Sequence, residues 1–280
     1  FDRSFLHLSP TIACITSMDL DHLDVYSDAA SLQDAYEEFA SQVKGSLFVE
    51  KNIPLKGITY SVSEEADFYI DGIRPDASGS YFDLHTPDGV YRNQFFNQLG
   101  MHNLSNALVA LAMASKSGLL VEDLTKSLAS FPGIERRLQV LINEKNRVLI
   151  DDYAHHPTEI KAVYETLKLS FPADEKCVVF QPHLFSRTQD FMTDFAVVLS
   201  LFDRVLLLDI YPARELPIEG VSSGVLKEMI SGPSVELIAK KELANRLSLV
   251  DERIIVLLGA GDIGIEVEGI KHKLLYNEAL

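Results

Sequence analysis

Cysteine is scarce, tryptophan is absent and long apolar runs are missing from this sequence of 280 residues. The two cysteines, Cys14 and Cys177, cannot form a disulfide framework, and each lies in an apolar run that favours a buried free thiol. We therefore expect a reducing, cytoplasmic setting. No stretch approaches the roughly 20 apolar residues that cross a bilayer, and no signal-peptide pattern opens the chain.

Basic residues are also in short supply. The sequence has 25 Lys and Arg against 41 Asp and Glu, a net charge of −16. This excess of negative charge repels nucleic acid and anionic membranes, so we expect neither as a partner. It does not exclude a small cationic pocket for phosphate. At roughly 150 residues per domain, the length predicts about two domains. Because the chain starts at Phe1 and enters an apolar strand almost at once, we expect its natural sequence to continue upstream.

The first half of the chain mixes strands and helices irregularly. Residues 10–16 predict a buried strand and residues 30–43 an amphipathic helix. Short β-type runs over 46–98 predict an antiparallel or mixed sheet. A helix begins near Leu104 and closes at Gly118.

The second half alternates continuous apolar strands with helices, which is typical of a parallel sheet covered on both faces. We place the domain boundary near residue 137, because a Phe-Pro-Gly turn precedes a strand-like segment there. The expected strands span 147–153, 177–181, 204–211 and 253–259, and the expected helices lie near 157–170, 189–202, 222–231 and 240–248.

Polar clusters follow three of these strands, and ligands of open α/β sheets bind beyond the carboxyl ends of strands. After the first strand, the paired imidazoles His155 and His156 next to Asp152 are hard to explain as packing, so a functional role is favoured. After the second, His183 could orient or deprotonate an amine and Arg187 could pair with a carboxylate. Helix capping by neighbouring hydroxyls is the alternative there.

The cluster at 259–264 has the spacing GxGxxG. That pattern alone is a weak sign of a dinucleotide site. Only 16 residues follow Gly264, too few for a helix, a second strand and a ribose-binding acid. A tight turn between strand and helix is therefore favoured over an NAD site.

Three further clusters are open to two interpretations on local chemistry alone. Carboxylates and an imidazole at 19–24 suit Mg²⁺, but an acidic turn that caps a helix is modestly favoured. The polar start of the helix at 100–106 suits a ring edge or phosphate, but ordinary capping is the better explanation. Arg136 and Arg137 are equally explained by phosphate binding at a hinge and by surface ion pairs.

Taken in order, these clusters resemble the Mur ligases, the ATP-dependent amide-bond-forming enzymes of peptidoglycan synthesis. Within the family they look like the members that join L-alanine to UDP-N-acetylmuramate, and DDYAHHPTE together with QPHxxSRT is the most specific part. The motifs cover nearly the whole chain: FDRSFLHLSP at the start, DxDHLDxY at 19–26, GMHNLSNALVAL at 100–111, GIERR at 133–137, DDYAHHPTE at 151–159, VFQPHLFSRT at 179–188, YPARELPIEG at 211–220 and LLGAGDI at 257–263.

The resemblance implies an α/β fold with two parts. Residues 1–137 would be the C-terminal part of a central, mixed-sheet ATPase domain, and residues 138–280 a Rossmann-like, parallel α/β C-terminal domain. A UDP-binding domain, a P-loop and a Mg²⁺-binding Glu would precede the chain, so we expect the chain alone to be inactive. The implied reaction uses ATP and Mg²⁺ to phosphorylate the lactyl carboxylate of UDP-N-acetylmuramate, and the amine of L-alanine then attacks the acyl phosphate.

The resemblance also assigns roles to residues in the first part. His22 would be a catalytic residue that ligates a second Mg²⁺ near the acyl phosphate. Asn103 and Asn106, with His102 beside them, would face the adenine of ATP.

In the second part, Arg137 or Arg136 would reach the ATP phosphates. Asp152, Tyr153 and His155 would line the ribose and phosphate side. His183 and Arg187 would place L-alanine, and Arg187 would bind its carboxylate.

Two departures from the family pattern bear on these roles. Many members carry Arg where this chain has Leu184, so recognition of L-alanine would depend on Arg187 and His183 alone. Some sister ligases use a carbamoylated lysine soon after the histidine motif, but no lysine occurs between His22 and Lys44. The alternatives are a ligase that recycles a tripeptide, another Mur-type or folylpolyglutamate-type ligase and, more remotely, a dinucleotide-binding module.

Overall fold

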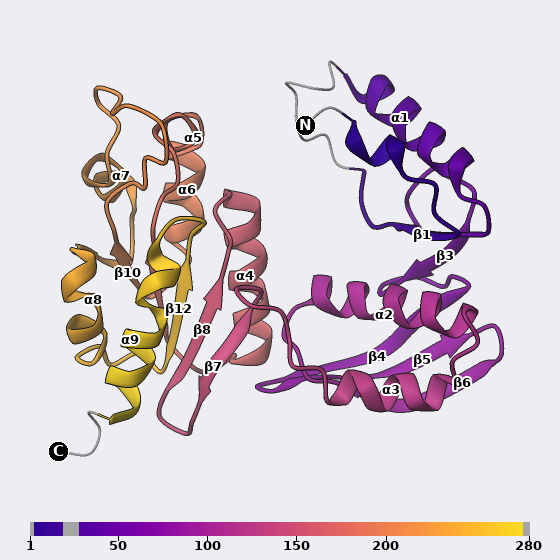
Figure 1. The fold of residues 1–280 in the computed structure, drawn as a ribbon. Helices are drawn as coiled ribbons and strands as arrows, with labels where there is room; N and C mark the ends of the chain where they lie inside the picture. The colour runs from indigo at the N-terminus through magenta and orange to yellow at the C-terminus, as the bar shows by residue number, and fades with distance from the viewer. Residues whose placement is uncertain (1–2, 19–27, 277–280) are drawn as a thin grey trace. The chain divides into compact units, whose positions relative to one another are not determined.

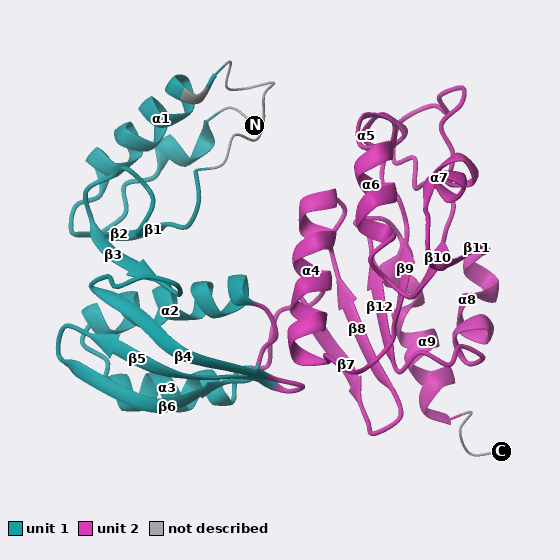
Figure 2. Cartoon of the chain, turned by 180° about the vertical axis from the view of Figure 1, so that it is seen from behind, with its two compact units in different colours: residues 1–75, 79–97, 101–131 teal, residues 76–78, 98–100, 132–280 magenta. Residues whose placement is uncertain are grey.

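The computed structural model of the chain describes residues 3–18 and 28–276 (Figure 1). It consists of two compact units, each with its own sheet and core (Figure 2). The predicted boundary at residue 137 stays a prediction. The first unit contains residues 1–75, 79–97 and 101–131, and the second contains residues 76–78, 98–100 and 132–280.

The first unit is built on a mixed sheet with the strand order β1-β2-β3-β4-β5-β6. The pairs from β1 to β4 are parallel, whereas β5 and β6 are antiparallel. This arrangement confirms the mixed alternative for the region after residue 46. The strands are β1 (Ile12–Ile15), β2 (Ser46–Glu50), β3 (Ile58–Ser61), β4 (Phe68–Asp76), β5 (Gly79–Thr86) and β6 (Gly89–Phe96).

Helices of the first unit bury one apolar face each. The helix α2 packs Leu104, Leu108 and Leu111 into a core that includes Phe48 and Tyr60 of the sheet. The sequence pattern did not predict α3, which is nine residues long. The helices are α1 (Ala29–Gln42), α2 (Met101–Lys116) and α3 (Val121–Ala129), with a 3₁₀ turn at Ser4–His7.

The second unit contains a sheet with the order β11-β10-β9-β12-β8-β7. All of its pairs are parallel except the pair between β7 and β8, which confirms the Rossmann-like prediction. The last strand, β12, lies between β8 and β9. The strands are β7 (Gln139–Asn143), β8 (Val148–Asp152), β9 (Lys176–Phe180), β10 (Arg204–Leu207), β11 (Ser234–Leu237) and β12 (Ile254–Leu258).

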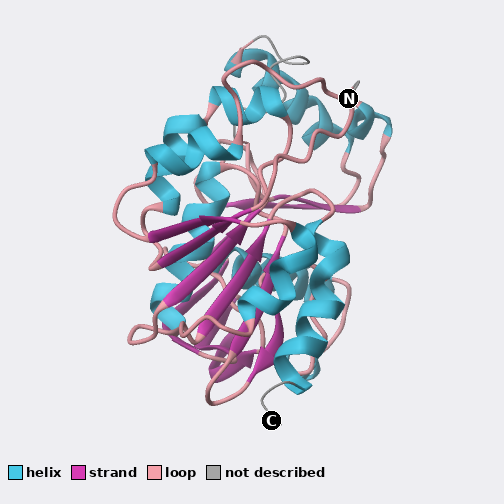
Figure 3. Cartoon of the chain, turned by 90° about the vertical axis from the view of Figure 1, so that its left-hand side faces the viewer, coloured by secondary structure: helices cyan, strands magenta, loops and turns pink. Residues whose placement is uncertain are grey.

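Helices cover both faces of this sheet (Figure 3). The helices α4, α6 and α7 bury apolar side chains against one face, and α8 and α9 cover the other. Both faces are therefore apolar, which explains the continuous apolar strands in the sequence. The helices are α4 (Pro157–Ser170), α5 (Phe185–Asp190), α6 (Met192–Leu199), α7 (Ser223–Met229), α8 (Lys240–Leu247) and α9 (Ile263–Tyr276).

Two predicted elements of the second unit need correction. The helix expected near 189–202 is shorter and corresponds to α6, and a separate helix, α5, precedes it; Phe191 lies between them at φ −113° and ψ 17°, outside helical geometry. The strand expected at 204–211 ends at Leu207, and Tyr211 instead forms an isolated bridge with His183. Within the described part of the chain, no helix is both long and apolar enough to cross a membrane.

Candidate active site

The polar clusters predicted at strand ends converge in the second unit. Because β12 pairs with both β8 and β9, the carboxyl ends of these three strands lie side by side. The glycine-rich loop after β12 lies at this edge. Six of the predicted site residues lie on or near it: Arg136, Asp152, Tyr153, His155, His183 and Arg187.

Asp152 supports the backbone of this edge. It is 4% exposed, and its Oδ2 accepts a hydrogen bond of 2.7 Å from the Leu138 amide. Its Oδ1 accepts one of 2.7 Å from the Ala154 amide. Each oxygen therefore holds a backbone amide, so the carboxylate fixes both the chain that enters β7 and the loop after β8. A direct contact of Asp152 with ribose stays a prediction.

Asp151 and Arg136 form a buried ion pair beside Asp152. Asp151 is 2% exposed, and its Oδ2 lies 3.4 Å from Nε of Arg136. Burial raises the pKa of Asp151 to about 6, although the guanidinium opposes this rise. Arg136 also donates from Nη2 to the carbonyl of Gly259, and its Cζ lies 4.9 Å from the ring centroid of Tyr153. The guanidinium of Arg136 thus interacts with three residues of its own unit, Asp151, Gly259 and Tyr153.

Arg137, the neighbouring arginine, has a different environment. Its side chain is exposed, and within the described part of the chain no hydrogen bond or ion pair engages its guanidinium. The two arginines that the sequence could not distinguish are therefore distinguished by their contacts: Arg136 is held, and Arg137 is available to a ligand.

The paired histidines have separate roles at the start of α4. The Glu159 carboxylate accepts hydrogen bonds from the amides of His155, at 2.8 Å, and His156, at 3.1 Å, which forms a capping box. His156 Nδ1 accepts the Thr158 amide, and its ring packs edge-on against Phe191. The His155 ring instead lies 6.2 Å from the ring of His183, so His155 is the histidine of the pair that faces the candidate site.

Replacing Glu159 with alanine should lower the free energy of unfolding by about 1–2 kcal/mol, because two amides lose their acceptor. Urea denaturation of the chain measures this. The control is Glu165→Ala on the exposed side of the same helix, where we expect a change within about 0.5 kcal/mol. Equal effects of the two variants would contradict the capping role.

His183 and Arg187 lie together at the end of β9. Nη1 of Arg187 is 3.5 Å from Nδ1 of His183, and the His183 ring stacks on Tyr211 with centroids 5.6 Å apart. Burial, Arg187 and His155 lower the pKa of His183, while Glu215 opposes them. These effects favour the neutral imidazole, which is the form that can accept a proton.

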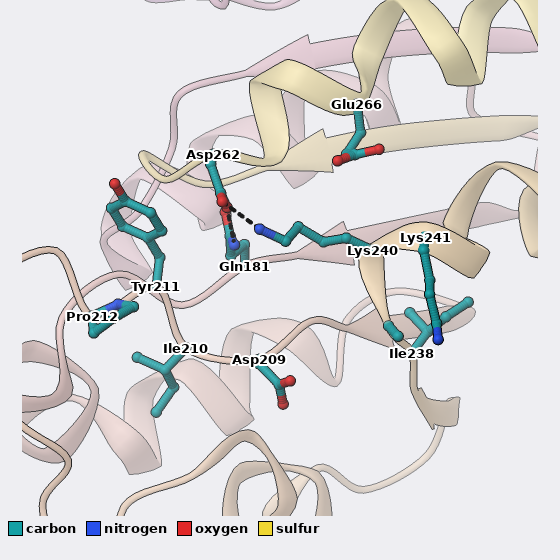
Figure 4. Close-up of a pocket in the computed structure, with 11 residues that line it drawn as sticks. Gln181, Asp209, Ile210, Tyr211, Pro212, Ile238, Lys240, Lys241, Asp262 and Glu266 are labelled. Carbon is teal, nitrogen blue, oxygen red and sulfur yellow. Dashed lines mark hydrogen bonds and ion pairs between the residues drawn. The ribbon is translucent and has the colours of Figure 1, made fainter.

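A pocket of about 690 Å³ is lined by Tyr211, on which the His183 ring stacks, and by residues that include Gln181, Lys240 and Asp262 (Figure 4). Lys240 forms an ion pair with Asp262, and Gln181 donates from Nε2 to the same carboxylate at 2.7 Å. Gln181 Oε1 accepts the amide of Ile263 at 2.9 Å. Gln181 and Asp262 belong to clusters that the sequence showed, whereas nothing in the sequence pointed to Lys240, because its partner is 22 residues away.

The loop after β12 is a tight turn, as predicted. At Gly261, an added Cβ would lie 2.5 Å from Oε1 of Gln181 and 2.8 Å from Cβ of Tyr211, so only glycine fits there. At Gly264, a Cβ would lie 3.1 Å from Cζ of Arg136. The side chain of Arg136 therefore covers the start of α9, where the pyrophosphate of a dinucleotide would bind. The dinucleotide alternative is not supported.

The remaining predicted site residues belong to the first unit. His102, Asn103 and Asn106 lie in the first two turns of α2, where His102 and Asn106 are exposed and Asn103 is half-buried. Their contact with adenine stays a prediction. His22 lies outside the described residues, and among those that the structure describes, no group of three or more His, Cys, Asp or Glu could hold a metal ion.

Comparison with known protein families covers most of the chain. A model of the Mur ligase middle domain matches residues 3–114, and a model described as Mur ligase, glutamate ligase domain, matches residues 136–261. The chain belongs to the Mur ligase family. As a Mur ligase it contains the middle and C-terminal domains, as the motifs indicated.

Named relatives are similar over nearly the whole chain. The UDP-N-acetylmuramate–L-alanine ligase of Christiangramia forsetii is 50% identical over 278 residues, which are 99% of this chain and 62% of that protein. The protein of the same name from Flavobacterium psychrophilum is 50% identical over 276 residues, 98% of this chain and 62% of that protein. This Mur ligase chain thus spans less than two thirds of the length of these relatives.

Solved structures show the same fold. The UDP-N-acetylmuramate-alanine ligase of Thermotoga maritima matches 99% of this chain and 62% of its own, with a TM-score of 0.80 at 22% identity. Another Mur ligase of that organism, solved in complex with ADP, matches 96% of this chain and 63% of its own, with a TM-score of 0.71 at 17% identity. At these identities the likeness concerns the fold.

Proposed function

We propose that this chain is part of an ATP-dependent ligase that joins L-alanine to the lactyl carboxylate of UDP-N-acetylmuramate in peptidoglycan precursor synthesis. The observation that carries this proposal is the 50% identity, over 99% of the chain, to a ligase of that name. By full-length ligase we mean this chain together with the part of its relatives' length that it does not cover. The adjacent His183 and Arg187 support the proposal, because they suit a small amino acid.

L-Alanine would bind at the end of β9. The guanidinium of Arg187 would pair with the substrate carboxylate. In the structure, Nη1 of Arg187 lies 3.5 Å from Nδ1 of His183. When Arg187 turns to the substrate carboxylate, Nδ1 of His183 would lose this contact and become free to accept a proton. The neutral imidazole would then take a proton from the substrate ammonium, and the free amine would attack the acyl phosphate and displace phosphate.

ATP would be bound by residues of the sequence motifs described above. Arg137 would reach the phosphates, because its guanidinium has no partner among the described residues. Tyr153 and His155, with Asp152 behind them, would line the ribose and phosphate side. His102, Asn103 and Asn106 would face the adenine from the exposed start of α2.

Mg²⁺ would be held by His22 in the DxDHLDxY segment. Three carboxylates and one imidazole form a donor set that suits this ion. When bound, the ion would neutralise charge on the transferring phosphoryl group. We also infer a cytoplasmic location, because the two cysteines are free and the reaction needs ATP.

The assignment of the substrates has a direct test. The full-length ligase should release ADP and phosphate only when UDP-N-acetylmuramate and L-alanine are both present. Faster turnover with another amino acid would assign the chain to a different Mur-type ligase, and faster turnover with a tripeptide would assign it to the recycling ligase.

Replacing Arg187 with alanine in the full-length ligase should raise the KM for L-alanine about tenfold and leave the KM for ATP unchanged, because a charged hydrogen bond to the carboxylate is lost. Steady-state kinetics with each substrate varied in turn measures both constants. Lys227→Ala, which removes an exposed cation of α7, is the control and should change neither. An unchanged KM for L-alanine would refute the role of Arg187.

A further inference from the structure

The helix α5, which carries Arg187, has an unusual N-terminal cap. The residue before it, Leu184, has no side-chain group that could accept a backbone amide. The cap comes instead from Glu215, 29 residues later in the chain. The Ser186 amide donates to Oε2 of Glu215 at 3.0 Å, and the Ser186 hydroxyl donates to Oε1 at 2.5 Å.

Hydrogen bonds at a second place also join the segment at the start of α5, residues 182–186, to residues 211–215. The Leu184 amide donates to the carbonyl of Tyr211 at 2.9 Å, and the Tyr211 amide donates to the carbonyl of Pro182 at 2.8 Å. Leu184 itself has φ +69°, a conformation that costs free energy for a leucine and persists only when surrounding bonds hold it. The bonds to Tyr211 and Glu215 lie on its two sides.

We propose that Glu215 is a positioning residue for the amino-acid substrate, which keeps Arg187 and His183 side by side by fixing the start of α5. This inference rests on the proposed function. Glu215 acts through Ser186 rather than on the substrate, because both of its carboxylate oxygens already accept hydrogen bonds.

The charges around His183 agree with this role. The hydrogen bonds from Ser186 lower the pKa of Glu215, so its carboxylate stays ionised. That negative charge raises the pKa of His183, against burial, Arg187 and His155, which lower it. A negative charge is also favourable at a helix start. Removing the carboxylate should therefore shift the pKa of His183 further down.

The test compares three variants of the full-length ligase. Glu215→Ala should raise the KM for L-alanine about tenfold at an unchanged KM for ATP, since a displaced helix start moves the carboxylate-binding arginine. Glu215→Gln can still accept the Ser186 amide, so it should restore the KM for L-alanine. Both variants should shift the acidic limb of the pH profile of kcat/KM for L-alanine to lower pH. Glu219→Ala, an exposed carboxylate of the same segment, is the matched control and should change nothing.

Amide hydrogen exchange separates this inference from the proposed function. In Glu215→Ala, but not in Glu219→Ala, the Ser186 amide should exchange at least tenfold faster while the melting temperature stays near that of the wild type. If the wild-type ligase does not use L-alanine, the proposed function is wrong. The cap is tested independently, because an unchanged exchange rate of the Ser186 amide in Glu215→Ala would refute it. If the wild type uses L-alanine and Glu215→Ala has the same KM and pH profile, the positioning role is overturned.

Discussion

Replacing Arg137 with alanine in the full-length ligase should lower kcat/KM for ATP about 10²–10³-fold, because the variant loses the guanidinium that we propose contacts the ATP phosphates. Its side chain is exposed and has no partner among the described residues, so the fold should keep its stability. Coupled release of ADP measures the turnover, and urea denaturation measures the stability.

The neighbouring variant, Arg136→Ala, is the matched comparison. It leaves Asp151, which is 2% exposed, without its cation and should cost about 3 kcal/mol of unfolding free energy. The loop after β12 also loses the bond from Arg136 to the carbonyl of Gly259. Two results together would contradict these assignments. One is that Arg136→Ala loses ATP turnover but keeps its stability, and the other is that Arg137→Ala keeps ATP turnover but loses stability.

The stability of the chain should depend on pH through Asp151. Its pKa is about 6 in the folded protein, and its ordinary value is 3.8. Between these two values the folded state holds a proton that the unfolded state has released. The stability contributed by this group is therefore complete below the ordinary pKa and is lost as the pH rises through 6. The loss amounts to about 2 kcal/mol between pH 4 and pH 7.

Comparison with Asp151→Asn isolates this contribution. Asparagine does not titrate, and all other groups affect both proteins alike. Relative to the variant, the wild type should become about 2 kcal/mol less stable between pH 4 and pH 7, as measured by urea denaturation at several pH values. Asp190→Asn, at an exposed position of α5, should show no such trend. A flat difference for Asp151→Asn would mean that burial does not raise this pKa.

Much of the fold was predictable because the relevant signals are local. The apolar runs that became β8, β9 and β12 and the helical periodicity of α2 and α4 are visible within short windows of sequence. The short elements α3 and β11 were missed, because nine and four residues give little periodic signal. The helix α5 was also missed, because its six residues FSRTQD contain one apolar side chain and give no periodic signal.

The sequence by itself determined the family and the residues at the strand ends, because motif order and spacing are properties of the chain alone. Only the tertiary structure showed which contacts those residues make with distant parts of the chain. Arg136 is held by Asp151 and by a carbonyl 123 residues away, which leaves Arg137 free for a ligand. Glu215 caps a helix that begins 30 residues before it. Both contacts join segments that are distant in the sequence. The local sequence does not indicate which partner a charged side chain contacts after folding.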